Sequence, residues 1–328
     1  MKKRSHRLEK MARVYDEEIL PVWSRRFGRM LLRDLSIPPR AMVLDVGCGT
    51  GYPSLEILEM MDDHGRIIAL ESVPPLLDVA RRKAGDLAGK RIFFRSEPAS
   101  AKLAFADEVY DLVISNLGLT ALGNPPLAIQ EFARVAKARG QVRVTLPLAG
   151  TYSEFFDIYR EVLTRDDRSD LLTRLEERVA VMPDADTAAG WMEAAGLTDV
   201  QVDVDEFTLL FQSSREFFFA PVIEYGPLVG WKEIAGKGEQ MQSVFWRIKE
   251  AIDAYFSGRA FELTVKAGCL RGIRDVSLPQ ELVEDTDEVT QPRVQVDETE
   301  HLTDTRAAAP AARRQEQGSA PRREKDEE

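Results

Sequence analysis

Residues 43–54 read VLDVGCGTGYPS, with Gly47, Gly49 and Gly51 at alternating positions directly behind an apolar run. Glycine displaces better strand and helix formers where the backbone needs unusual dihedral angles or where another molecule approaches closely. A phosphate, a nucleoside or a bare turn could each require such a segment. The spacing G-C-G-T-G is one residue too tight for the G-x-G-x-x-G of a dinucleotide site, and the segment does not match a G-x-x-x-x-G-K-[ST] phosphate loop.

Glu71 closes the next apolar run about twenty residues after the glycine turn, where an acidic residue can bind the two ribose hydroxyls of a nucleotide. A glycine turn without pyrophosphate spacing, followed by such an acid, fits a nucleoside ligand. The same spacing disfavours a nicotinamide-dependent dehydrogenase.

The elements that must position these residues alternate between residues 41 and 147. Short apolar runs span 41–48, 66–72, 91–97, 110–118 and 140–147. Their continuous apolar character is typical of strands buried on both faces of a parallel sheet. The intervening segments carry apolar residues at helical spacing, the last helix ending in KARG at 137–140. We predict an α/β fold with right-handed crossovers, whose ligands bind outside the carboxyl ends of the strands.

The pattern changes after Pro147. Residues 151–195 are predicted to be mostly helical, and a strand-like run follows at 197–211. An aromatic-rich helical region then precedes a final strand at 260–270. The aromatic residues of that region either line an apolar acceptor pocket or pack the insertion onto the sheet, and the packing interpretation is favoured; they are Phe211, Phe217, Phe218, Phe219, Tyr225 and Trp231.

Charge is distributed unevenly along the chain. The formal net charge is −11; residues 276–328 hold 14 Asp and Glu and seven Lys and Arg, a net −7 that leaves −4 for the other 275 residues. This segment lacks aromatic residues, so we predict a disordered acidic tail that serves solubility, with a binding partner as the lesser interpretation. A mildly acidic remainder argues against a nucleic-acid groove.

Other sequence features set the expected environment. No apolar run is long enough to predict a membrane span, and the basic N-terminus lacks the apolar stretch of a secretory signal. Two cysteines, Cys48 and Cys269, show no metal-ligand spacing and are too few for a disulfide framework. We therefore expect a cytoplasmic protein without a metal site.

VLDVGCGTG, Glu71 at the end of the next strand and DLVISNLGL at 111–119 resemble the class I S-adenosylmethionine-dependent methyltransferases. The resemblance implies a Rossmann-like, seven-stranded, mostly parallel sheet with helices on both faces and a helical insertion before the last strand. It also implies S-adenosylmethionine as the cofactor. The residues expected to surround it are Asp45, Gly47, Cys48, Gly49, Gly51, Glu71, Ser72, Ala99, Ser100, Asn116, Leu117 and Gly118.

The resemblance also assigns roles and boundaries. Asp45 and the glycine turn would surround the methionine end, Glu71 would hold the ribose, and residues 116–118 would line the sulfonium and acceptor side. The expected organisation is an N-terminal helical segment at 1–40, a methyltransferase domain at 41–275 with a cofactor half at 41–147 and an acceptor half at 148–275, and the tail at 276–328.

Two departures from the family pattern concern the adenine side and the strand that follows. Where many relatives carry G-D-A-x-x-L-P-F, this chain aligns Ala99 with the acid that meets the adenine amine. Backbone groups near Ala99 and Ser100, or Glu97 through a register shift, would then hold adenine. KARG at 137–140 replaces the usual K-P-G-G turn.

The acceptor is less defined. Methyl transfer from a sulfonium needs mainly alignment and desolvation, and a base only where the acceptor must lose a proton. None of the histidines at 6, 64 and 301 is well placed as a base, so an ionised acceptor such as a carboxylate is favoured, with Tyr15 and Tyr152 as weak catalytic candidates.

The layout is similar to that of the malonyl-carrier-protein O-methyltransferases and of the ubiquinone/menaquinone C-methyltransferases, and Tyr15-Asp16 matches their common opening. We therefore expect a small-molecule or carrier-bound acceptor. The alternative is a catalytically weak S-adenosylmethionine-binding regulator or scaffold.

Overall fold

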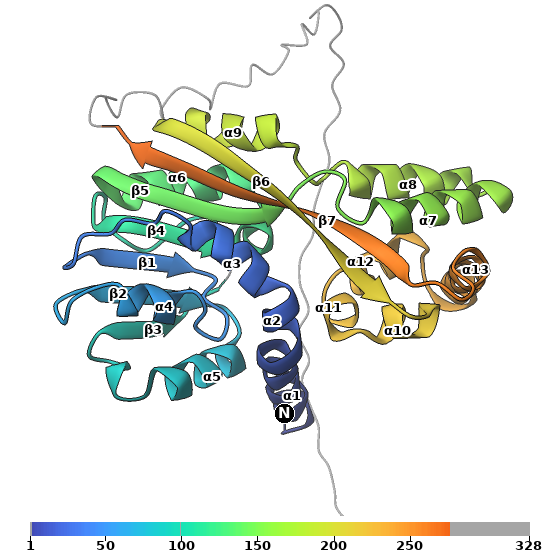
Figure 1. Cartoon of the computed structure of the whole chain (residues 1–328), viewed down its shortest axis with the longest axis horizontal. Coiled ribbons are helices and arrows are strands. Elements are labelled where there is room, and N and C mark those ends of the chain that lie inside the picture. Colours follow the sequence, from blue (N-terminus) through green and yellow to red (C-terminus); the bar gives the residue numbers. More distant parts are fainter. Residues whose placement is uncertain (1, 99, 276–328) are drawn as a thin grey trace, which may run out of the picture. The chain divides into compact units, whose positions relative to one another are not determined.

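The computed structural model describes residues 2–98 and 100–275. Within these residues, seven strands form one sheet in the order β3-β2-β1-β4-β5-β7-β6 (Figure 1). β1 to β5 are parallel to one another, whereas β7 runs antiparallel to β5 and β6. The strands are β1 Met42–Val46, β2 Arg66–Glu71, β3 Ile92–Ser96, β4 Tyr110–Asn116, β5 Ala136–Pro147, β6 Leu197–Phe211 and β7 Phe261–Arg274. The predicted Rossmann-like sheet is confirmed.

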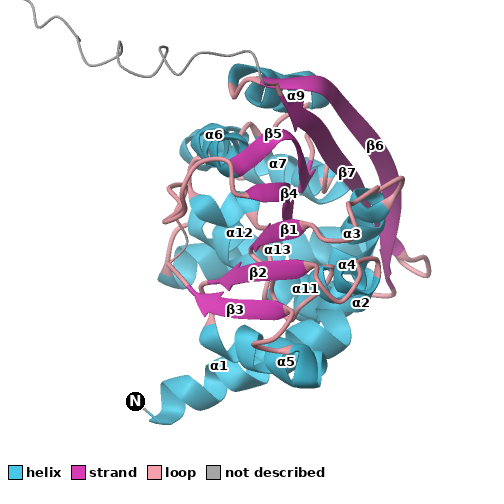
Figure 2. Ribbon diagram, turned by 90° about the vertical axis from the view of Figure 1, so that its left-hand side faces the viewer, coloured by secondary structure: helices cyan, strands magenta, loops and turns pink. Residues whose placement is uncertain are grey.

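The central strands are buried on both faces, as their continuous apolar runs predict. Val43 and Leu112 face one core cluster, which includes Leu31 of α3 (Ser24–Leu32) and Ile57 of α4 (Ser54–Glu59). Their neighbours in the chain, Leu44 and Val113, face the other core cluster, which α6 (Pro125–Val135) and α9 (Ala185–Ala194) complete. Figure 2 shows α6 on one side of the strands and α3 and α4 on the other.

The crossover helices begin where the sequence supplies start signals. α5 (Pro74–Ala84) and α6 both have proline in the first turn, where the missing N–H has no helical partner to lose. Asn124 caps α6, and its side chain accepts a hydrogen bond of 3.2 Å from the backbone N–H of Leu127. Two short 3₁₀ turns, η2 (Gly85–Leu87) and η3 (Leu119–Leu122), complete these connections.

The boundary between α6 and β5 differs from the prediction. The helix was expected to end in KARG at 137–140, but α6 ends at Val135 and β5 begins at Ala136, so KARG lies inside β5. The register between β4 and β5 shifts between Tyr110 and Leu112, and Arg139 adopts a φ of 63°. A strand irregularity therefore occupies the place of the family's usual turn.

The predicted N-terminal helical segment consists of α1 (Lys2–Val14), the π-helical turn η1 (Tyr15–Ile19), α2 (Leu20–Val22) and α3. In Figure 1 these elements run from the N-terminus up to the edge of β1. Phe27, Met30 and Leu31 are the buried apolar residues of α3. The segment thereby brings Tyr15 and Trp23 to the carboxyl ends of the central strands.

After β5 the described chain forms three helices before the long strand β6 and four more between β6 and its partner β7. α7 (Ser153–Arg165), α8 (Ser169–Val179) and α9 precede β6. The predicted insertion between β6 and β7 contains α10 (Ser214–Phe219), α11 (Pro221–Glu224), α12 (Leu228–Ile234) and α13 (Gly238–Tyr255). Figure 1 shows β6 and β7 extending from the sheet to these helices.

The aromatic residues of the insertion mostly pack. Phe217 and Trp231 are buried, and the Trp231 ring stacks on Phe155 of α7 at 4.1 Å between centroids. Phe219 and Tyr225 are exposed. The favoured packing interpretation of this cluster agrees with the structure. No helix among the described residues has the length and apolar character to cross a bilayer, and the predicted tail at 276–328 lies outside those residues.

Candidate functional site

A cavity of about 250 Å³ opens at the carboxyl ends of β1, β2 and β4, where open α/β sheets place their ligands. Its walls come from four parts of the chain: the N-terminal helices, the glycine turn, the end of β2, and the segments on either side of β4. The lining residues are Tyr15, Trp23, Ser24, Val46, Gly47, Gly49, Leu70, Glu71, Ser72, Leu76, Glu97, Pro98, Ser100, Lys102, Leu103, Asn116, Leu117, Gly118, Ala121 and Leu122.

Glycine is needed in this turn for two separate reasons. A Cβ added to Gly118 would lie 2.5 Å from the carbonyl oxygen of Val46, and one added to Gly47 would lie 2.9 Å from the Cα of Gly118. These two glycines let the ends of β1 and β4 touch. Gly49, with a φ of 54°, instead faces the cavity, and a Cβ there would approach the Tyr15 hydroxyl to 3.3 Å.

Glu71 is oriented by backbone amides. Its Oε2 accepts a hydrogen bond of 3.1 Å from the Gly49 N–H, and its Oε1 accepts one of 3.0 Å from the Val73 N–H. The hydroxyl of Ser72 donates to the same Oε1 at 3.3 Å. Each carboxylate oxygen of Glu71 can still accept another hydrogen bond. The side chain is therefore held in place and remains able to bind a ligand hydroxyl.

Asp45 lies behind the glycine turn and is fully buried. Ser54 donates a hydrogen bond of 2.5 Å to its Oδ2, while its Oδ1 has no hydrogen-bond partner among the described residues. The pKa of Asp45 is raised to about 7. Burial is the largest cause and the nearby charge of Glu71 adds to it, while the Ser54 hydrogen bond lowers the pKa. A buried carboxyl with an unused oxygen suits a site that receives a cation.

The end of β4 is tied to α3 and β5. Asn116 donates through Nδ2 to the Ser24 carbonyl at 3.1 Å and accepts through Oδ1 from the Thr145 hydroxyl at 2.7 Å. The Leu117 N–H, from a residue with a φ of 65°, donates to Thr145 Oγ1 at 3.1 Å. Because both polar ends of its amide are engaged, Asn116 fixes the cavity wall at the start of α3.

The N-terminal helices cover the cavity through Tyr15 and Asp16. The Tyr15 hydroxyl lies 2.9 Å from the Ser24 hydroxyl, and burial raises the pKa of Tyr15 to about 12. Asp16 accepts hydrogen bonds from Thr50 in the glycine turn at 2.5 Å and from Lys83 of α5 at 2.8 Å. The π-helical turn is therefore fastened to both the turn and the crossover helix.

Trp23 forms the opposite part of this cover. Its ring stacks on Tyr152 with centroids 6.0 Å apart, and it meets Phe207 of β6 edge to face. Tyr152 is buried, which raises its pKa well above the ordinary value, and it meets Trp231 edge to face at 5.3 Å. Tyr152 thus lies behind Trp23 and does not line the cavity.

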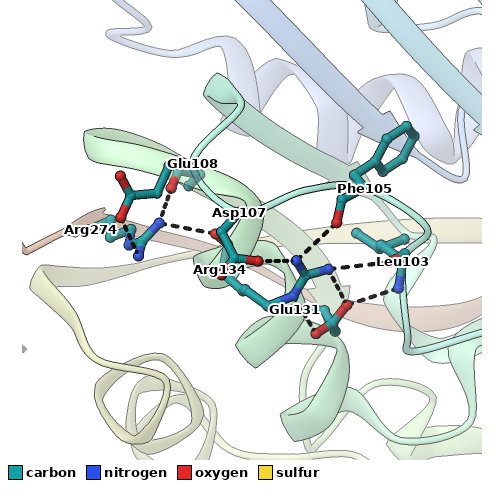
Figure 3. Close-up of polar contacts among 8 residues, drawn as sticks. Leu103, Phe105, Asp107, Glu108, Glu131, Arg134 and Arg274 are labelled. Carbon is teal, nitrogen blue, oxygen red and sulfur yellow. Dashed lines mark hydrogen bonds and ion pairs between the residues drawn. The ribbon is translucent and has the colours of Figure 1, made fainter. Parts of the chain in front are cut away.

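The segment between β3 and β4 closes the remaining side, and polar contacts from α6 hold it (Figure 3). The Leu103 N–H donates to Glu131 at 2.9 Å, and Arg134 donates to the carbonyl oxygens of Leu103 at 3.1 Å and Phe105 at 2.9 Å. Glu97, at the start of the segment, forms an ion pair of 2.6 Å with Arg95.

The structure brings most of the sequence-predicted residues together. The predicted residues that line the cavity are Tyr15, Gly47, Gly49, Glu71, Ser72, Ser100, Asn116, Leu117 and Gly118. Asp45, Cys48 and Gly51 are buried behind its wall, and burial raises the pKa of the Cys48 thiol well above its ordinary value. Ala99 lies outside the described residues. The sequence reasoning missed Trp23, Ser24, Leu76 and Leu122, which carry no motif of their own.

These residues fit an adenosyl sulfonium. Gly49 lines the cavity without a side chain, and a Cβ there would press against Tyr15. Glu71 presents carboxylate oxygens at the end of β2, and Asp45 supplies a buried carboxyl group behind the turn. The lining also contains the apolar side chains of Leu76 and Leu103, which offer contact to a flat base, together with Ser100 and Glu97.

Comparison with known proteins agrees with this geometry. A family described as "Methyltransferase domain" matches residues 39–178. The demethylmenaquinone methyltransferase of Renibacterium salmoninarum is 30% identical over 187 residues, which are 54% of this chain and 75% of that protein. The malonyl-[acyl-carrier protein] O-methyltransferase of Halorhodospira halophila is 30% identical over 208 residues, 62% of this chain and 64% of that protein.

A solved structure shows the same fold. The crystal structure of the YcgJ protein from Bacillus subtilis superposes with a TM-score of 0.52 over 76% of this chain and 99% of that one, at 15% identity. The enzyme interpretation is confirmed by the relatives, in preference to a non-catalytic regulator or a nicotinamide-dependent dehydrogenase. The chain belongs to the class I S-adenosylmethionine-dependent methyltransferases, and S-adenosylmethionine is its methyl donor.

Proposed function

We propose that the cavity at the ends of β1, β2 and β4 binds the donor with its ribose at Glu71 and its methionine end at Gly47 and Gly49. Asn116 to Gly118 then face the sulfonium and the acceptor. The amide hydrogen bonds that orient Glu71 and the lack of a side chain at Gly49, which lines the cavity, support this placement. The bound donor supplies a methyl group already activated as an electrophile, so the protein's work is alignment and exclusion of water.

The residues around the cavity offer no evident general base. The described lining contains no histidine, and the raised pKa of Tyr15, about 12, keeps its hydroxyl protonated near neutral pH. Tyr15 can therefore donate a hydrogen bond but does not take up a proton. His6 and His64 lie on α1 and on the loop before β2, outside the cavity lining. A proton that the acceptor releases therefore passes to a carboxylate of the lining or to water, and not to a histidine of the described lining or to Tyr15.

The acceptor-side wall that we infer, from α3, the end of β4 and η3, is mostly apolar and includes no cation among its described residues. It consists of Trp23, Ser24, Asn116, Leu117, Ala121 and Leu122. Lys102, the cation of the described cavity lining, comes instead from the segment between β3 and β4. A compact carboxylate is costly to bury without a partner, whereas an ionised aromatic hydroxyl spreads its charge over a ring that can stack on Trp23.

We therefore propose that the enzyme methylates a ring carbon of a small quinol-type acceptor. The carbon–methyl bond forms as the sulfur–methyl bond of the donor breaks, and the proton on that ring carbon is then lost to water. The single observation that supports this choice is the apolar, cation-free wall beside Trp23. The demethylmenaquinone methyltransferases among the relatives support the same acceptor class.

The experiment is a transfer assay with methyl-labelled donor and two acceptors, a short-chain demethylmenaquinol and a malonyl thioester of a carrier protein. Alkali releases methanol from a methyl ester but leaves a carbon-bound methyl group in place. Alkali-stable label on the quinol is the expected result. Label that appears only on the carrier and is released by alkali would reject the quinol proposal.

A carrier-bound carboxylate is the second candidate, because of one feature of α3. Arg25, Arg26 and Arg29 are exposed directly after Trp23, and none of them has an ion-pair partner among the described residues. Such a face suits an acidic carrier protein. Under this proposal the label on the carrier is lost when Arg25 and Arg26 are replaced by Gln, and it is retained when the distant, exposed Arg259 is replaced.

A further inference from the structure

The wall between β3 and β4 has to be held by side chains. Residues 101–109 form no helix and no strand, yet Lys102 and Leu103 line the donor cavity. This is also the region where the family's adenine-contacting acid is missing. An irregular segment makes a defined wall only if its backbone groups have fixed partners.

We infer that Arg134 and Glu131 of α6 are positioning residues that shape this segment into the adenine side of the donor cavity. The inference rests on the proposed placement of the donor. Neither residue lines the cavity. Glu131 acts through the backbone of Leu103, and Arg134 acts through the backbone of Leu103 and Phe105, as Figure 3 shows.

The contacts form a closed network. Glu131 accepts from the Leu103 N–H at 2.9 Å, and Arg134 donates to the Leu103 carbonyl at 3.1 Å, so Leu103 is held by both its backbone groups. Arg134 also donates to the Phe105 carbonyl at 2.9 Å and forms an ion pair with Asp107. The Arg134 and Glu131 side chains bond each other twice at 2.8 Å.

A second route connects Arg134 to the other end of the wall. The Phe105 ring, whose carbonyl Arg134 holds, lies under the guanidinium of Arg95 at 5.0 Å and meets Tyr110 edge to face. Arg95 in turn pairs with Glu97, which lines the cavity. Glu97, at the start of the segment between β3 and β4, and Leu103, near its middle, are therefore both linked to Arg134.

Arg134 is itself held from the edge of the sheet. Arg274, at the end of β7, donates to the Arg134 carbonyl at 3.0 Å and pairs with Glu108 at 3.0 Å. The Glu108 N–H donates to the same Arg134 carbonyl at 3.1 Å. The anchor is thus part of the sheet framework, and the segment is positioned relative to it.

The chemistry of the network requires arginine. One guanidinium bonds two carbonyls and two carboxylates that lie in different directions, and its planar, five-donor geometry allows this. A lysine has the same charge but a single nitrogen, so it cannot span the carbonyls of Leu103 and Phe105 together. The conservative substitution Arg134→Lys therefore separates the geometric role from the charge.

The test measures binding of S-adenosylhomocysteine and of its inosine counterpart, which lacks the adenine amine, by calorimetry. We expect Arg134→Lys to weaken S-adenosylhomocysteine about tenfold and to reduce the preference for it over the inosine compound. The steady-state KM for the donor should rise more than kcat falls. Glu131→Gln should weaken S-adenosylhomocysteine binding and reduce the preference for adenine by a smaller factor. This variant provides the test if Arg134→Lys does not fold.

Arg160 of α7 is the matched control. It donates to Glu176 and Asp157 and has a similar side-chain exposure, 32% against 29%, but lies away from the cavity. Arg160→Lys should leave both affinities unchanged. Equal effects of the two lysine variants, or an unchanged preference for adenine in Arg134→Lys and Glu131→Gln, would overturn the inference. A wild-type chain that fails to bind S-adenosylhomocysteine would instead overturn the donor placement on which it rests.

Discussion

At the scale of single residues, the glycine turn combines two requirements. Gly47 and Gly118 allow two strand ends to touch, because either Cβ would lie within 3 Å of backbone atoms of the other segment. Gly49 serves the cavity, since it lines the cavity and a Cβ there would press against the Tyr15 hydroxyl at 3.3 Å. The sequence shows three glycines at alternating positions but not which requirement each one meets, because the partner of Gly47 lies some seventy residues further along the chain.

The two requirements can be separated with a matched pair of variants. Gly49 and Gly85 have nearly the same φ, 54° and 53°, but nothing lies within 4 Å of a Cβ at Gly85. Valine at either position should strain the fold, because both glycines have a positive φ that side chains rarely adopt. Only Gly49→Val should abolish binding of S-adenosylhomocysteine, as measured by calorimetry. Retained binding in Gly49→Val would show that the donor does not occupy this end of the cavity.

At the scale of elements, the N-terminal helices serve as a cover fastened at few points. Asp16 is the main polar fastening, because it bonds both Thr50 in the glycine turn and Lys83 on α5. The charge of Asp16 stays paired as long as η1 lies over the turn. Tyr15 of the same turn lines the cavity, so loosening η1 should open that side of the cavity.

We therefore expect Asp16→Ala to speed dissociation of S-adenosylhomocysteine, by roughly tenfold if about 1.4 kcal/mol of the fastening is lost. Stopped-flow displacement measures the rate. Glu18→Ala, an exposed acid on the same turn, is the control and should leave the rate unchanged. Identical rates for the two variants would mean that η1 does not limit release of the donor.

Much of the secondary structure was predictable from the sequence. The seven strand-like runs correspond to β1–β7 with shifts of one to four residues at most of their ends, because apolar runs bounded by glycine and proline are strong local signals. The early start of β5 was missed, since residues 136–139 have helical character and enter the strand through pairing with β4. Trp23 and Ser24 were missed as cavity residues because only the tertiary fold brings α3 to the end of β4.

At the scale of the whole described chain, one apolar core runs from the sheet into the C-terminal helices. The same cluster contains Val43 of β1, Phe155 of α7 and Trp231 of α12. Trp231 also meets Tyr152, which stacks on Trp23 in the cavity wall. Through these rings the insertion is coupled to the acceptor side of the cavity.

A pair of tryptophan substitutions tests this coupling. Trp231 is 2% exposed and Trp246 is 61% exposed, and both belong to the insertion. Trp231→Ala should lower the unfolding free energy by about 3–5 kcal/mol, as large core deletions do. Below its melting temperature it should raise the acceptor KM and leave the donor affinity within about twofold. Trp246→Ala should change neither stability nor kinetics appreciably, and an equal change in both KM values for Trp231→Ala would contradict the coupling.

The β6–β7 ribbon has a consequence for how this enzyme could be altered. Phe211 and Phe261 are paired neighbours in the ladder, so residues 212–260 leave and re-enter the ribbon at adjacent points. Such geometry is what allows one module to be exchanged for another without disturbing the host. A chimera that keeps the ribbon and grafts a different helical module onto its tip, with an apolar face to meet Phe155, offers a direct way to change substrate preference while conserving the donor machinery.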